Sequence, residues 1–84
     1  MDTVTLLATV AAVLTTSSFI PQAWKVIRYR ETAGLSVTMY AMFTVGVLFW
    51  LIFGILIEEW PVIIANIITF VLALTILVMK IRLG

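Results

Sequence analysis

Two side chains in the middle of long apolar segments could bind a polar ligand. Trp50 and Asn66 lie at equal sequence distance before and after Glu58, which belongs to a turn between two such segments. At a helical rise of about 1.5 Å per residue, both side chains lie roughly 12 Å below that turn. An indole offers an apolar ring face, and an amide offers two donors and two acceptors. Trp50 and Asn66 therefore form a candidate site for a neutral, hydroxyl-rich ring.

Both residues also have a purely structural interpretation. Trp50 stands between Gly46 and Gly54 at four-residue spacing, so the indole could fill space between closely packed helices. Asn66 could satisfy its amide by a hydrogen bond to a neighbouring helix. The other two tryptophans lie at segment ends, where an interfacial belt is expected, whereas Trp50 lies deep. Its position therefore favours a ligand-facing role.

The segments that carry these residues are predicted to span a membrane. The chain has 84 residues, of which 64% are hydrophobic and 11% charged, and so few polar residues cannot cover a soluble surface. Three apolar segments of roughly 20 residues are each long enough to cross a hydrocarbon core of about 30 Å. They run from about 3 to 24, 36 to 57 and 60 to 79, within a single domain at 1–84. The predicted fold class is all-α integral membrane.

The composition excludes several kinds of function. The chain has no His and no Cys, so the usual residues for a metal site or for a Cys or His nucleophile are missing. We expect no metal, no cofactor and no enzymatic activity. A net charge of +1 gives no indication of nucleic-acid binding, and we expect none. Because no charged side chain lies inside a span, downhill transport is favoured over ion-coupled pumping.

The charges also predict an orientation and an assembly. All five basic residues lie in the first loop or after the third span, and Asp2, Glu58 and Glu59 lie on the other side. Lys and Arg stay on the cytoplasmic side, so the N-terminus is expected outside and the C-terminus inside the cell membrane. Three helices are too few to enclose a solute path, so a transporter would need two copies. Because both copies share one orientation, we expect a parallel homodimer.

The first span is the most polar, and it contains a proline. Pro21 has no N–H for the carbonyl of Ser17, so the helix should bend there, and Ser18 and Gln22 lie within a turn of the freed carbonyl. Thr15, Ser18 and Gln22 follow helical spacing. This polar stripe either bonds to a neighbouring helix or lines a path. Pro21 is a hinge candidate.

Two later helices have recognisable start signals. Ser36, together with Thr38, can cap the second helix through side-chain hydroxyls. Pro61 suits the first turn of the third helix, where a missing N–H costs no hydrogen bond.

Taken together, these residues resemble a known family. Phe19-Ile20-Pro21-Gln22 is similar to the PQ-loop signature, and the three-span length, Trp50 and Ile64-Ala65-Asn66 resemble the bacterial SemiSWEET sugar transporters. The resemblance covers essentially the whole chain. Further residues match in order and spacing: Met39, Tyr40, Gly46, Gly54 and Pro61.

The resemblance implies a fold and a mechanism. The fold is a three-helix bundle, with the third helix packed between the first and second, in a parallel homodimer of six helices. The activity is that of a uniporter for mono- or disaccharides, working by alternating access around a central pocket. The implied functional residues are Trp50 and Asn66 for sugar binding, Pro21 and Gln22 for the hinge, and Met39 and Phe43 for the inner gate.

The outer mouth departs from the family pattern. Some members place a tyrosine, an arginine and an acidic residue there, whereas this chain has Phe53, Ile57 and Glu59. We therefore expect a mainly apolar outer gate formed by Phe53 and Ile57.

Two other functions fit the sequence. A PQ-loop carrier could move amino acids or other small polar solutes, as relatives in this superfamily do, although uncharged spans disfavour a zwitterion. A structural subunit of a larger membrane complex would use Asn66 and the glycines for packing. The structural role predicts that Trp50→Ala disrupts assembly, whereas the transport role predicts intact dimers that no longer carry substrate.

Overall fold

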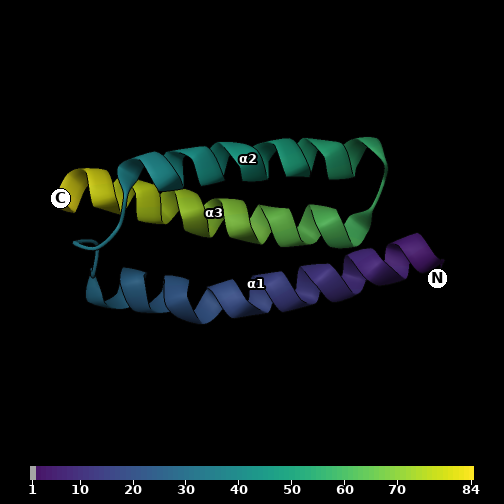
Figure 1. Cartoon of the computed structure of the whole chain (residues 1–84), viewed down its shortest axis with the longest axis horizontal. Helices are drawn as coiled ribbons and strands as arrows, with labels where there is room; N and C mark the ends of the chain where they lie inside the picture. Colours follow the sequence, from purple (N-terminus) through teal and green to yellow (C-terminus); the bar gives the residue numbers. More distant parts are fainter. Residues whose placement is uncertain (1) are drawn as a thin grey trace.

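The chain folds into three long helices. The computed structural model describes residues 2–84, with α1 at Thr3–Tyr29, α2 at Val37–Leu56 and α3 at Trp60–Leu83, and with no strand in that range (Figure 1). Each helix is long and apolar enough to cross a membrane. The predicted all-α membrane class is therefore confirmed. The helices α1 and α3 extend past the predicted span ends near residues 24 and 79. Each helix continues into the polar residues that follow its apolar span.

Side-chain caps and a proline mark where the helices begin. The Asp2 carboxylate accepts a hydrogen bond from the backbone N–H of Thr5 at 2.7 Å, and this bond holds the pKa of Asp2 below its usual value. Ser36 Oγ accepts from the N–H of Met39 at 3.1 Å, which confirms the predicted cap of α2. Pro61 lies in the first turn of α3, also as predicted.

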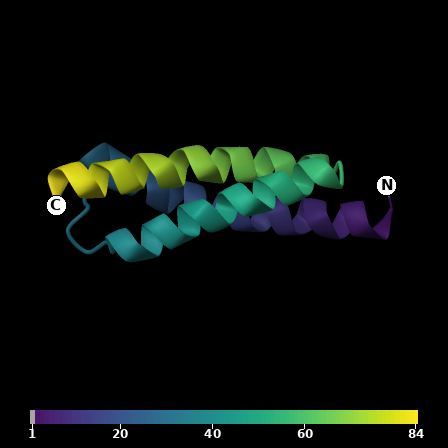
Figure 2. The same cartoon turned by 90° about the horizontal axis from the view of Figure 1, so that it is seen from above.

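The helix α3 lies between α1 and α2. It packs against both, whereas α1 and α2 do not pack backbone to backbone within residues 2–84. Figure 1 shows α3 in the middle, and Figure 2 shows α2 crossing it obliquely. The loop from α1 to α2 passes the C-terminal end of α3, where Lys80 Nζ lies 3.5 Å from the carbonyl of Ala33. The helix order implied by the family resemblance is therefore confirmed.

Few side chains are buried in the single chain. One cluster holds Ala23 and Val26 of α1, Tyr40 of α2 and Ile76 of α3. Only 6%, 22% and 17% of the most apolar windows of α1, α2 and α3 are buried. A large exposed apolar surface requires apolar surroundings, which a bilayer and a partner chain both supply.

The helix α1 remains α-helical through Pro21. The proline supplies no N–H to the carbonyl of Ser17, and Figure 1 shows α1 changing direction along its length. Ser18 does not replace the lost bond, because its hydroxyl donates to the carbonyl of Thr15 at 2.9 Å. At the other end of α1, Thr5 Oγ1 donates to Glu59 Oε1 at 3.0 Å and links α1 to the start of α3.

Candidate substrate-binding groove

A groove of about 740 Å³ opens between the three helices. All three helices line it, because α1 and α2 stand apart on either side of α3. It brings together four of the predicted site residues: Gln22, Phe43, Trp50 and Asn66. The other four, Pro21, Met39, Phe53 and Ile57, are not part of its lining. No lining residue is charged, and the hydroxyl and amide side chains are Thr15, Thr16, Ser18, Gln22, Asn66 and Thr69.

Trp50 forms an aromatic wall of the groove. Its side chain is 58% exposed in the single chain. Its ring meets Phe53 edge to face, with centroids 5.6 Å apart and an interplanar angle of 86°. This contact positions the indole and leaves ring surface free to stack on the C–H face of a ligand.

Asn66 has only a local hydrogen bond. Its Nδ2 donates to the carbonyl of Val62, one turn earlier in α3, at 2.8 Å. The side chain is half-buried, and no bond from it to α1 or α2 is present within residues 2–84. The helix-to-helix bond considered as its structural role is therefore absent from the described chain. The amide lines the groove with its oxygen available to a ligand donor.

The polar stripe of α1 also lines the groove. Thr15 Oγ1 donates to the carbonyl of Ala11 at 2.8 Å, and Ser18 donates to that of Thr15 at 2.9 Å. Both donors are therefore used within α1, which leaves hydroxyl oxygens as acceptors. Thr69 of α3 is a lining residue that the sequence analysis missed. Thr69 lies one turn after Asn66 on the same helical face, and this spacing could have identified it as a lining residue.

A contact between aromatic rings bridges α1 and α2. The Phe43 ring lies 5.8 Å from that of Phe19 in α1 and 6.3 Å from that of Tyr40. No sequence pattern indicated the Phe19–Phe43 pair, because the rotation of two separate helices is set by packing. Met39, the second inner-gate candidate, is 50% exposed near the start of α2.

The outer-gate candidates Phe53 and Ile57 do not line the groove. Phe53 is 47% exposed, and Ile57, the residue that follows α2, is 46% exposed. Phe53 also lines a smaller cavity of about 410 Å³ with Gly46, Phe49 and Trp50. In the single chain, Trp50 thus connects the groove to this aromatic surface of α2.

Comparisons with known proteins place the chain in a family. The model of the PQ loop repeat matches residues 3–63. A relative from Escherichia coli (strain UMEA 3162-1), named "Sugar transporter SemiSWEET", is 49% identical over 93% of this chain and 88% of its own length. A relative of the same name from Leptospira biflexa is 42% identical over 94% of this chain and 93% of its own length. The chain belongs to the SemiSWEET family of PQ-loop proteins.

Solved SemiSWEET structures share the fold described above. A crystal structure of SemiSWEET in the inward-open conformation superposes with a TM-score of 0.88 at 46% identity, covering 96% of this chain and 94% of the other. The crystal structure of a bacterial homologue of SWEET transporters gives a TM-score of 0.81 at 38% identity, covering 99% and 100%. The resemblance drawn from the PQ signature and Trp50 is therefore confirmed at the level of family and fold.

Proposed function

We propose that the chain is a uniporter for neutral mono- or disaccharides. The observation that carries this proposal is the groove that Trp50 and Asn66 share, with an exposed indole and an unshared amide oxygen in an uncharged cavity. An aromatic face and amide groups match the C–H face and hydroxyls of a sugar. The SemiSWEET relatives, which are named sugar transporters, support the same substrate class.

The proposal includes a parallel homodimer in the cell (inner) membrane. One groove has walls from only three helices and stays open, so a second copy facing it would complete a central pocket with two indoles and two amides. The N-terminus would face outward, and the basic end with Lys25 and Lys80 would face the cytoplasm. The binding partners are then a second copy, the sugar and the bilayer.

Alternating access would arise from movement of α1 about Pro21 and Gln22. The ring contact between Phe19 and Phe43 spans the gap between α1 and α2, and this supports Phe43, with Met39, as the inner gate. Phe53 and Ile57 would close the outer side by apolar contact between copies. With no charged residue in the groove, the sugar would move down its gradient without ion coupling.

Transport into liposomes that contain the purified protein tests this function. We expect labelled glucose or sucrose to enter, and we expect Trp50→Ala and Asn66→Ala each to reduce uptake at least tenfold while the protein still runs as a dimer. A tenfold loss corresponds to about 1.4 kcal/mol. Uptake from an amino-acid panel without uptake of sugar would show that the substrate is an amino acid and not a sugar. An intact dimer that carries neither would reject the transport role.

A further inference from the structure

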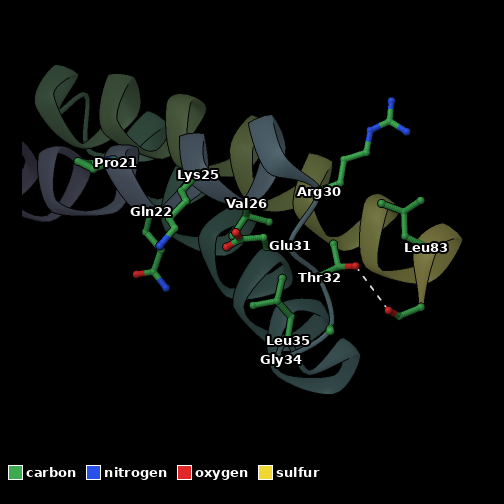
Figure 3. Close-up of a pocket in the computed structure, with 12 residues that line it drawn as sticks. Pro21, Gln22, Lys25, Val26, Arg30, Glu31, Thr32, Gly34, Leu35 and Leu83 are labelled. Carbon is green, nitrogen blue, oxygen red and sulfur yellow. Dashed lines mark hydrogen bonds between the residues drawn. The ribbon is translucent and has the colours of Figure 1, made fainter.

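A second cavity lies at the C-terminal end of α1. Its volume is about 920 Å³, and it is lined by the last turns of α1, the α1–α2 loop and the end of α3 (Figure 3). Gln22 lines both this cavity and the groove that contains Trp50 and Asn66. The two cavities are therefore neighbours that meet at the Gln22 side chain.

Three polar side chains of this second cavity lack partners among its lining residues. Figure 3 shows the Lys25 side chain beside that of Gln22, with the Glu31 carboxylate pointing toward them and the Arg30 guanidinium pointing away. The hydrogen bond drawn between lining residues joins Thr32 to the carbonyl of Gly84 at 3.5 Å. The ammonium, carboxylate and amide groups at this end of the groove are thus available to a ligand.

These groups continue the polar stripe of α1. Ser18, Gln22 and Lys25 follow one another at spacings of four and three residues, so they share one helical face. The distance from Ser18 to Lys25 along the helix axis is roughly 10 Å. A row of hydrogen-bonding side chains therefore leads from the groove into the second cavity.

We propose that Gln22, Lys25 and Glu31 form a second sugar-binding subsite, which a sugar occupies between the groove and the cytoplasm. This inference rests on the proposed function. A sugar hydroxyl both donates and accepts, so neighbouring hydroxyls can accept from Lys25 and donate to Glu31. The opposite charges of Lys25 and Glu31 disfavour a simple anion or cation, and the amino-acid panel described above tests a zwitterion, which this pair would also suit.

The subsite has a specific kinetic consequence. A passive carrier produces no net flux at equal concentrations, so its kcat/KM is the same in both directions. Binding energy gained in a bound ground state but absent from the transition state lowers KM and slows the following step by the same factor, so kcat/KM is unchanged. A subsite that only holds sugar near the exit therefore lowers KM and kcat together. Its removal should raise both by the same factor.

The test measures sugar flux from the Lys25 side in membrane vesicles of defined orientation. We expect Lys25→Met and Glu31→Met each to raise KM on that side at least threefold, with kcat/KM within twofold of the unmodified chain. These substitutions change the net charge in opposite directions, so an effect of charge alone would shift KM oppositely. Arg30→Met is the matched control, since Arg30 borders the same cavity but points away, and its KM should not change.

The outcomes separate this inference from the proposed function. An unmodified chain that carries no sugar overturns both. If the unmodified chain carries sugar, an unchanged KM in Lys25→Met and Glu31→Met overturns the subsite alone, as does a shift of equal size in Arg30→Met. A fall in kcat/KM shared by both variants in intact dimers also overturns it, because the two residues would then act in the transport step itself.

Discussion

The two glycines that flank Trp50 differ in their surroundings despite their equal spacing. A Cβ built on Gly54 would lie 2.9 Å from Cγ1 and 3.3 Å from Cβ of Val62 in α3. A Cβ on Gly46 would meet nothing within 4 Å. Gly54 therefore allows α2 and α3 to approach closely, whereas Gly46 borders the open aromatic cavity beside Trp50. The packing interpretation of the glycines holds for Gly54 within one chain.

We expect Gly54→Ala to be less stable than Gly46→Ala by about 1–3 kcal/mol in free energy of unfolding. Both substitutions gain the same helix propensity, so their difference isolates the clash with Val62. That side chain is branched at Cβ and cannot easily rotate away. Thermal unfolding in detergent measures the difference. Equal stability of the two variants would show that α2 and α3 can separate at little cost.

The helix α1 is the element with the fewest fixed contacts. Only 6% of its most apolar window is buried, and its backbone packs closely on α3 alone. Pro21 interrupts its hydrogen-bond ladder at the carbonyl of Ser17. α1 is held at its first turn by the Thr5–Glu59 bond and, just before Pro21, by the Phe19–Phe43 contact. A helix that is weakly packed and interrupted can change its bend while α2 and α3 remain together.

We expect Pro21→Ala to slow sugar transport about tenfold without loss of the dimer. Alanine restores the N–H to the Ser17 carbonyl and stiffens α1, so the movement that opens one side becomes harder. Pro61→Ala is the matched control, because Pro61 lies in the first turn of α3, where no internal bond is lost. Uptake into liposomes measures both variants. Equal rates in Pro21→Ala and Pro61→Ala would mean that the bend of α1 is not the moving part.

The whole molecule has two unlike faces. The groove with Trp50 and Asn66 opens on one face. A separate cavity of about 480 Å³ between α1 and α3 is lined by Trp60, Ile64 and Ile68. The two cavities lie on adjacent sides of α1, and both are lined by Ala12 and Thr16. A parallel dimer that joins two grooves leaves the Ile68 side toward lipid.

We expect the Gly46→Cys variant to be cross-linked into a dimer. The Ile68→Cys variant should remain a monomer under the same treatment. The chain has no cysteine of its own, so each variant carries a single thiol. Gly46 borders the cavity beside Trp50, whereas Ile68 lines the cavity between α1 and α3 and is 39% exposed. A short bifunctional thiol reagent added to membranes, followed by denaturing electrophoresis, measures this. Cross-linking at Ile68 but not at Gly46 would reverse the proposed dimer face.

The sequence by itself determined the properties that depend on local composition. Long apolar runs predict membrane helices whatever their neighbours, because lipid insertion depends on the residues of each segment. The Ser36 cap and Pro61 are likewise local features that the structure reproduces. The PQ signature with Trp50 and Asn66 was sufficient to identify the family.

The tertiary structure alone decided which side chains meet. The spacing of Gly46 and Gly54 is symmetrical about Trp50, yet only Gly54 faces α3 closely, because the rotation of α2 is set by packing across the bundle. The Phe19–Phe43 contact joins residues of two helices that α3 holds apart. Gln22 connects two cavities because the α1–α2 loop turns beside it. Such contacts depend on how the three helices are positioned relative to one another, and the sequence of a single helix does not determine that arrangement.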